Sequence, residues 1–473
     1  MSYEFLIHDQ PAKITTSFIV GNAIVKAPAF IPEIKGDEDL RALLRCASTL
    51  PQGHPIMVPS RRWMQLISNP IIGTKASLSG LTPINKFIEQ HPIYFLDPPE
   101  FFRYTLRGEL VNYAMRGERV SEFYGYLKKG EIDKAIAMAP LFFQPFIKRQ
   151  LKSICSSKKI SYEESIKSPP HVERAWLDDE TSEGYFPYIY DVAVEAIKMP
   201  SAILIPPVPP LTKDSENTSI SRIKSSNRVA SYVCKDISEK FEPLLGKETR
   251  SLYPYFHLYV DWTIADDQEG LGIETIKQIL DSELISAKDT DKGFAGVALT
   301  ISRYHEAADR RSLAKIEGLV NEVVNICHQH MLPVILPRSG YYGLSLTDLE
   351  IQGFGILLNG NSRYTPKGGR PNPEDLYGKT PIIDKCCDFK INEVMELIRK
   401  NKEFPKIPGL NGRPTKEDFD NPALYRERWA KRMRILVHLE ETRRLRESKL
   451  KGIGSPARRY LERSEHPHLS ILH

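Results

Sequence analysis

Three acidic residues stand at or just after the ends of short apolar runs in this chain. Asp97 closes the run over residues 92–97, and Glu100 follows it three residues later. Asp261 lies near the end of the run over residues 255–263. A carboxylate at the carboxyl end of a buried strand is where barrel enzymes carry their catalytic groups. Such carboxylates act as nucleophiles or as general acids and bases, so all three are catalytic candidates.

Two of these carboxylates also have structural explanations. Asp97 is placed to cap a helix predicted over residues 100–116, because an Asp before a helix accepts hydrogen bonds from its first N–H groups. Capping and catalysis by Asp97 are compatible. Asp261 is explained equally well by an ion pair with a nearby arginine such as Arg303. Both interpretations of Asp261 stay open.

Cations and aromatic rings follow other apolar runs, together with Glu33 and Lys35 on the first one. They suit an anionic substrate with a ring, because arginine forks bind phosphate and aromatic faces stack on an extruded base. A surface position explains each arginine alone, so only their convergence favours a site. The substrate-binding candidates are Trp63, Arg303, Tyr304, Arg338, Asn359 and Arg363. The candidates for contacts with nucleic-acid phosphate are Arg61, Arg62, Lys367 and Arg370.

Eight apolar runs alternate with amphipathic helical patterns, which indicates repeated βα units and a parallel sheet. We predict an α/β fold, a (β/α)8 TIM-type barrel. Helical patterns are weak or short after the second, seventh and eighth runs, so an incomplete barrel stays open. The runs cover residues 27–35, 55–60, 92–97, 201–208, 255–263, 293–303, 332–338 and 353–359. The clearest helical patterns cover residues 38–50, 100–116, 227–245, 272–284 and 313–330.

Two additions to the barrel are expected near its ends. Residues 13–20 and 23–27 flank Gly21-Asn22, a two-residue link that suits an N-terminal hairpin plugging the barrel bottom. Residues 118–200, after the third strand, form a helical insertion that covers one side of the mouth. Its helical patterns cover residues 131–139, 145–154 and 188–198.

The basic excess of the chain is C-terminal. Residues 413–473 hold 15 Lys and Arg against 9 Asp and Glu, whereas the rest of the chain holds 50 against 51. Apolar residues between Tyr425 and Leu439 recur every three or four positions, which predicts a basic helical extension after a barrel domain over residues 1–412. This helix either packs on the barrel with a solvated face or contacts phosphate.

Composition narrows the class of protein. With 473 residues and 41% hydrophobic content, the chain can bury one large core with additions. The six cysteines lack zinc-ligand spacing, so we expect a reducing compartment and neither metal nor cofactor. No apolar run of about 18 residues and no leader pattern is found, so we expect a cytoplasmic protein without membrane contact.

Several segments resemble the tRNA-guanine transglycosylase superfamily. Residues 27–32, Ala-Pro-Ala-Phe-Ile-Pro, are similar to its T-P-A-F-M-P strand. Lys86-Phe87-Ile88, then Pro92-Ile93 and Asp97, resemble H-K-F-M followed by P-I-L-T-D-S-G-G-F. Weaker likenesses keep the family order at residues 256–261, 293–302 and 353–363.

The resemblance implies base exchange in a nucleic acid, in which an aspartate attacks the sugar C1′, guanine leaves and a 7-deazaguanine enters. Asp97 matches the aspartate of D-S-G-G-F, although Pro98-Pro99-Glu100 replaces the small residues that follow it in the family. Asp261 falls where the family places a base-recognising glutamine. The family acids expected on strands four and eight are absent from residues 205–210 and 356–363.

The zinc-ligand cysteines and the tRNA-binding module of the tRNA-acting members are also missing. The resemblance is therefore closer to the branch that modifies DNA, and we expect DNA as substrate more than tRNA. Two other classes stay open. One is a catalytically degenerate barrel that binds nucleic acid or supports a partner subunit, and the other is a barrel enzyme acting on a small phosphorylated metabolite. A protein partner and a homodimer are both compatible with the sequence.

Overall fold

The structure of the protein is a computed structural model. It describes most of the chain between residues 17 and 447. Among these residues, no helix is both long and apolar enough to cross a membrane. The described residues are 17–20, 23–60, 63–67, 81–96, 119–139, 144, 185–212, 217–241, 251–265, 271–289, 293–302, 310–358, 380–382, 387–389, 407–412 and 414–447.

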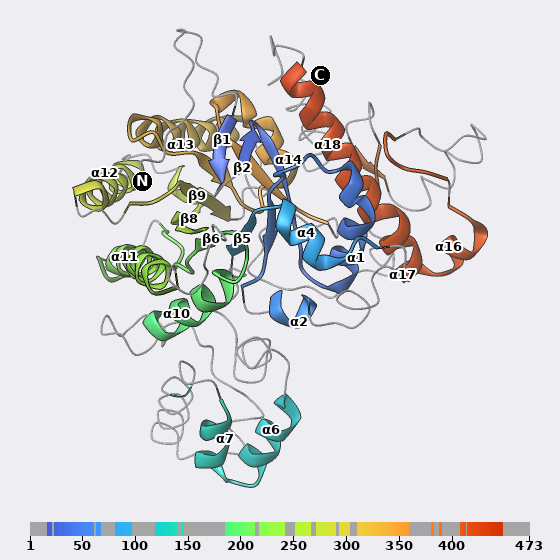
Figure 1. The fold of residues 1–473 in the computed structure, drawn as a ribbon. Helices are drawn as coiled ribbons and strands as arrows, with labels where there is room; N and C mark the ends of the chain where they lie inside the picture. The colour runs from blue at the N-terminus through green and yellow to red at the C-terminus, as the bar shows by residue number, and fades with distance from the viewer. Residues whose placement is uncertain are drawn as a thin grey trace.

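A nine-stranded parallel sheet forms the centre of the molecule (Figure 1). Its strand order is β7-β6-β5-β4-β3-β11-β10-β9-β8. The strands are β3 (Ala29–Glu33), β4 (Ile56–Val58), β5 (Ile93–Leu96), β6 (Ser201–Ile205), β7 (Ser251–Pro254), β8 (Phe256–Asp261), β9 (Val297–Ser302), β10 (Val334–Leu336) and β11 (Gly353–Leu357).

The two edges of this sheet meet at Tyr255, which alone separates β7 from β8. The N–H of Tyr255 donates a hydrogen bond to the carbonyl of Leu204 on β6, and the N–H of Phe256 donates one to the carbonyl of Gly296, just before β9. Both hydrogen bonds are 2.9 Å long. The sheet is therefore nearly barrel-shaped. Each of the eight predicted runs contains a strand, but the ninth strand, β7, lies outside all of them and was not predicted. Almost every residue of the nine strands is buried, as expected for a parallel sheet covered on both faces.

Helices cover the outer face of the sheet (Figure 1). Short helices follow the second and seventh strands, as their weak patterns predicted. The helix expected over residues 100–116 lies outside the described residues. The covering helices are α1 (Asp37–Cys46), α2 (Trp63–Ile67), α4 (Ile84–Gln90), α10 (Tyr185–Ala196), α11 (Asn217–Phe241), α12 (Leu271–Asp289), α13 (Arg310–Gln329) and α14 (Gly340–Ser345).

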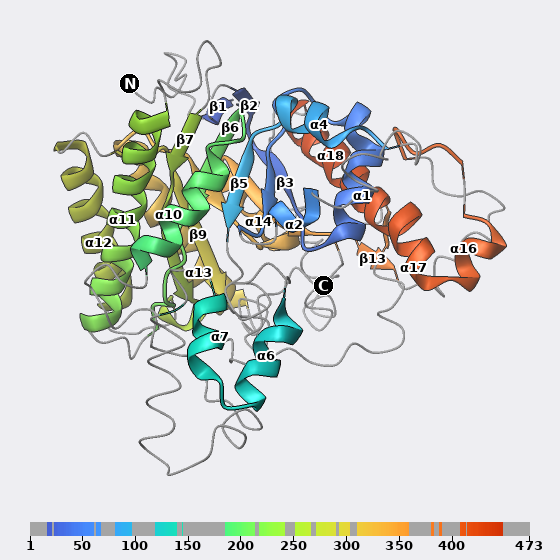
Figure 2. The same ribbon diagram turned by 60° about the horizontal axis from the view of Figure 1, so that its bottom comes forward.

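The described residues of the predicted insertion contain two kinds of helix, and the helix expected over residues 145–154 lies outside them. Helix α10, expected within it, packs against α11 and β6 and so belongs to the layer around the sheet. Helices α6 (Val120–Lys128) and α7 (Ile132–Met138) instead form a pair that projects from the body. In Figures 1 and 2 this pair and the N-terminal hairpin lie at opposite ends of the sheet. The pair therefore lies on the side of the strands' carboxyl ends.

The N-terminal hairpin closes the amino end of the sheet. Strands β1 (Ser17–Val20) and β2 (Ala23–Lys26) pair with Val20 opposite Ala23, as a two-residue link requires. Phe18 is buried in one apolar cluster with inward-facing residues of the central strands. Within that cluster the hydroxyls of Tyr94 and Tyr255 lie 3.1 Å apart. The predicted hairpin is confirmed, and it fills the amino end with apolar side chains.

The predicted C-terminal helix is present as α18 (Lys431–Glu447) and packs against α1 and β3. Met433, Leu436 and Val437 are buried within the same core as the outward-facing strand residues. Both ribbon views show α18 beside α1 (Figures 1 and 2). This helix therefore covers the sheet where a helix after the last strand is needed. The shorter elements around it are β12 (Thr380–Ile382), β13 (Cys387–Phe389), α16 (Lys416–Asp420), α17 (Pro422–Tyr425) and a π-helical turn over Arg426–Ala430.

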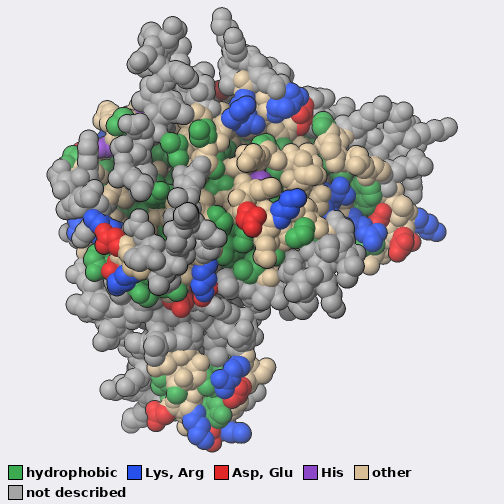
Figure 3. All heavy atoms as spheres, in the orientation of Figure 1, with side chains coloured by type: hydrophobic (Ala, Val, Ile, Leu, Met, Phe, Trp, Pro, Cys, Tyr) green, Lys and Arg blue, Asp and Glu red, His purple; other side chains and the backbone are tan. Residues whose placement is uncertain are grey.

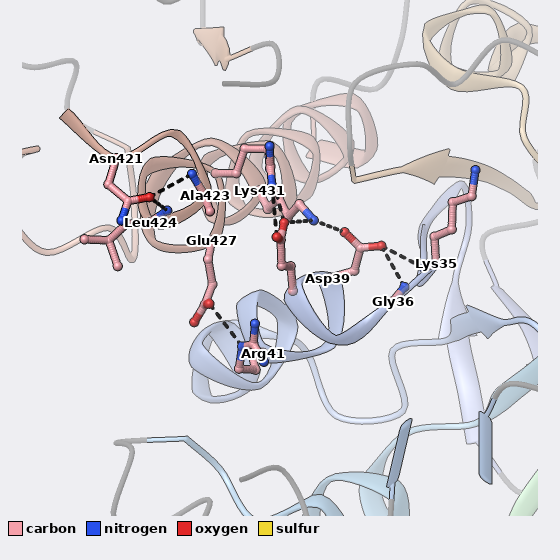
Figure 4. Close-up of polar contacts among 11 residues, drawn as sticks. Lys35, Gly36, Asp39, Arg41, Asn421, Ala423, Leu424, Glu427 and Lys431 are labelled. Carbon is pink, nitrogen blue, oxygen red and sulfur yellow. Dashed lines mark hydrogen bonds and ion pairs between the residues drawn. The ribbon is translucent and has the colours of Figure 1, made fainter. Parts of the chain in front are cut away.

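Basic residues at the start of α18 pair with acids of α1. The Nζ of Lys431 lies 2.5 Å from Oδ1 of Asp39 and 3.1 Å from Oε2 of Glu38, and Glu427 accepts a hydrogen bond from Arg41 (Figure 4). Burial alone would raise the pKa of Glu38, but the hydrogen bond from Arg426 and the charge of Lys431 lower it overall. These ion pairs join α1 to α18 and to the π-helical turn that precedes it.

Candidate active site

A buried polar layer occupies the inside of the sheet at the carboxyl ends of its strands. Side chains of a strand alternate between its faces, so Ala29 and Ile31 of the inner apolar cluster place Glu33 on the inner face as well. Tyr255 and Ala298 belong to the same cluster, so His257 and Asp261 on β8 and Thr300 and Ser302 on β9 also lie on the inner face. On β3, β8 and β9 the inner surface therefore changes from apolar near the hairpin to polar at the opposite end, whereas β5 and β6 end in the apolar Leu96 and Ile205.

Asp261 is the acidic residue of this layer on β8, and it is 4% exposed. Its Oδ1 accepts hydrogen bonds from the hydroxyl of Thr263 at 2.6 Å and from the N–H of Thr263 at 3.2 Å. Its Oδ2 accepts a hydrogen bond from the hydroxyl of Ser302, its register partner on β9, at 2.8 Å. These hydrogen bonds hold the carboxylate in one orientation.

Part of the structural explanation for Asp261 is correct. The side chain caps a single 3-10 turn over Trp262–Ile264. The alternative pairing with Arg303 concerns a residue outside the described part of the chain. Capping fixes the orientation of the carboxylate at the strand end, and this is also what a catalytic carboxylate requires.

His257 lies two residues after Tyr255 on β8, so its side chain is also on the inner face of the sheet, and its ring is neutral. Its Nδ1 lies 2.7 Å from the carbonyl of Pro206, so Nδ1 carries the proton and donates it. Its Nε2 then accepts from the hydroxyl of Thr300 at 3.0 Å. Burial is the main cause that lowers the pKa of His257 to about 4, and the charge of Arg338 acts in the same direction. His257 is therefore neutral at physiological pH.

Glu33, at the carboxyl end of β3, forms the second acidic centre of the layer and is 2% exposed. Its Oε1 accepts a hydrogen bond from the backbone N–H of Arg338, and its Oε2 lies 3.2 Å from Nε of the same residue. Burial raises the pKa of Glu33 to about 7, against the opposing charge and hydrogen bonds of Arg338. Near neutral pH this carboxyl is populated in both protonation states.

Backbone features make room for this pair. Gly355 is on β11, which lies between β3 and β10. Strand β3 carries Glu33, and Arg338 follows β10. A Cβ at Gly355 would collide with the Glu33 carboxylate and approach the Arg338 nitrogen to 2.9 Å. Arg338 has a φ of 55°, in the left-handed region that non-glycine residues rarely adopt. Two unusual positions therefore hold one carboxyl group in place.

Two of the predicted site residues lie within the described part of the chain at this end of the sheet: Asp261 at the end of β8 and Arg338 two residues after β10. Trp63 begins α2 and is completely buried in the outer core, so it presents no face to a substrate here. Its predicted role in stacking receives no support from this position. The other predicted site residues lie outside the described part of the chain: Asp97, Glu100, Arg61, Arg62, Arg303, Tyr304, Asn359, Arg363, Lys367 and Arg370.

Sequence reasoning placed Glu33 in the mouth but did not propose it as an acid or base. The signal was present, because Glu33 follows four apolar residues of the first run as Asp97 follows the third run. His257, Thr300 and Ser302 were missed for a different reason. Single polar residues inside an apolar strand become meaningful only when the register between β8 and β9 is known.

Comparison with known proteins does not assign a function to this site. No protein-family model matches the chain, and no curated protein matches it.

Proposed function

We propose that this chain is a base-exchange glycosyltransferase that replaces guanine in DNA with a 7-deazaguanine derivative, on a (β/α)8 TIM-type barrel. The observation that carries the proposal is Asp261, a buried carboxylate that three donors orient at the carboxyl end of a nearly barrel-shaped parallel sheet. The order of the transglycosylase-like segments along the sequence supports the same class of reaction.

The chemistry requires a carboxylate that attacks the sugar and a group that moves a proton. Asp261 suits the ionised role, since its hydrogen-bond donors stabilise negative charge. It is a candidate for attack at C1′ and for accepting hydrogen bonds from the amino and imino edge of a guanine-like base. Asp97 directly follows β5, which ends at Leu96, and it is proposed as the other candidate for attack at C1′, with Glu100 three residues after it.

DNA is proposed over tRNA because the full sequence has no spaced cysteine set of the kind the zinc-containing tRNA enzymes carry. On the described surface, charges of both signs alternate on the α6–α7 pair (Figure 3). There Arg119 pairs with Glu122 and Lys134 pairs with Glu131. The proposed attraction between the protein and DNA phosphate therefore depends on other cations, namely Arg61, Arg62, Lys367 and Arg370.

The proposal predicts that the purified protein exchanges labelled guanine or a 7-deazaguanine into duplex DNA, and that Asp261→Asn lowers the rate by about a hundredfold or more. Asparagine can still cap the Trp262–Ile264 turn through its side-chain oxygen, so the fold should persist. Asp133→Asn, an exposed change on α7, is the matched control and should leave the rate unchanged.

Unchanged exchange in Asp261→Asn would remove Asp261 from the mechanism. Binding of DNA without exchange by the wild-type protein would favour the degenerate barrel. Exchange into tRNA but not into DNA would reassign the polymer while keeping the reaction.

A further inference from the structure

The polar layer holds a second buried carboxyl group that the proposed function leaves unassigned. Glu33 faces the inside of the sheet from β3, at the same end as Asp261 on β8. Among the described residues, the cation in contact with it is Arg338, which engages it through both the backbone N–H and the side-chain Nε. Glu33 is thus a positioned acid inside the candidate active site.

The surroundings of Glu33 are more elaborate than a stabilising ion pair requires. A buried ion pair contributes little net stability, because desolvation offsets the attraction between the charges. Here the pair also depends on Gly355, whose missing side chain leaves space for the carboxylate, and on the left-handed backbone of Arg338. Strained backbone positions cluster at functional sites, and Arg338 is one of four non-glycine residues with a positive φ in the described part of the chain.

We propose that Glu33 transfers the proton that base exchange requires, and that Arg338 is the positioning residue that holds its carboxyl group. This inference rests on the proposed function and names its acid and base. Asp261, with three hydrogen-bond donors, keeps the ionised role, so the two carboxyl groups divide the chemistry between them.

The proton balance over the two half-reactions is closed. In the first, the bond between C1′ and N9 of guanine breaks with its electron pair going to the base, an aspartate oxygen bonds to C1′, and the Glu33 carboxyl gives its proton to N7 of the departing guanine. In the second, the Glu33 carboxylate takes the proton from N9 of the incoming 7-deazaguanine. N9 then bonds to C1′, and the ester bond breaks to restore the aspartate.

Among the described residues, the groups next to Glu33 keep a constant charge over the pH range in which it titrates. Its neighbours in the sheet are Met57 on β4 and Leu357 on β11, neither of which titrates. Arg338 stays positive, and burial keeps His257 neutral above its pKa of about 4. Since burial raises the pKa of Glu33 to about 7, this carboxyl both donates and accepts a proton near neutral pH.

The test uses the full-length protein and duplex DNA that carries either guanine or 7-methylguanine. A 7-methylguanine already bears the positive charge that protonation at N7 would supply, so it departs without a proton. Glu33→Gln should lower guanine release by about a hundredfold or more and leave 7-methylguanine release within about threefold of wild type. Gly355→Ala, which keeps the carboxyl but displaces it, should show the same selective loss.

Equal loss of both bases in a Glu33→Gln protein with wild-type circular dichroism would overturn the assignment, as would full guanine release. If the variants do not fold, the wild-type pH profiles decide. Guanine release must fall as the pH rises through about 7 while 7-methylguanine release stays level, and parallel profiles would reject the role. Wild-type protein that releases neither base would refute base exchange itself, whereas exchange that persists in Glu33→Gln would refute only the role of Glu33.

Discussion

At the scale of single residues, two buried carboxyl groups in one layer have opposite environments. Asp261 accepts three hydrogen bonds from Thr263 and Ser302, whereas Glu33 contacts one cation among the described residues, Arg338, and burial is the largest influence on the pKa of Glu33. Sites that need both a charged group and a proton donor commonly hold two acids in environments that give them different pKa values. His257 adds a neutral ring that orders Thr300 without adding charge.

Glu33 should also make stability depend on pH. Its folded pKa of about 7 lies above the ordinary value of 4.5, so the folded state holds the proton more tightly than the unfolded chain. This contribution is full below about pH 4.5 and is lost as the pH rises to about 7. Relative to Glu33→Gln, the wild-type free energy of unfolding should fall by about 3 kcal/mol over this range. Urea unfolding at a series of pH values measures the difference, and a flat difference would show that Glu33 titrates normally.

At the scale of elements, the sequence predicts strands better than the roles of helices. The eight apolar runs are unambiguous because a parallel strand buried on both faces contains little else. A helical pattern shows an apolar face but does not identify what covers it. Helix α10 was expected in the insertion for this reason, although it packs on α11 and β6. Likewise the charge of Lys431 is visible in the sequence, but its partners Glu38 and Asp39 lie almost the whole chain away.

Helix α18 should therefore behave as part of the barrel and not as a removable basic extension. Deletion of residues 413–473 exposes the apolar faces of α1 and β3, so we expect loss of cooperative thermal unfolding. Deletion of residues 448–473 alone leaves all of α18 in place and should preserve cooperative unfolding. Circular dichroism melts of the two truncations make the comparison. A cooperatively folded protein of residues 1–412 would mean that α18 is dispensable.

At the scale of the whole molecule, the architecture gathers the chemistry at one end. The hairpin fills the amino end with apolar side chains, the strands carry Glu33 and Asp261 at the other end, and the α6–α7 pair projects on that side (Figure 2). Asp261 and Arg338 were predictable because they end apolar runs. The pairing of Glu33 with Arg338 was not, since it depends on β3 and β10 flanking a glycine on β11.

The most direct test of base exchange is a trapped covalent complex. Wild-type protein is incubated with duplex DNA without an incoming base, denatured and digested, and the residue attached to the sugar is identified by mass spectrometry. We predict a link between C1′ of a deoxyribose and the carboxylate of Asp97 or Asp261. Protein that binds DNA but forms no such link, or a link at a residue away from the strand ends, would contradict the account.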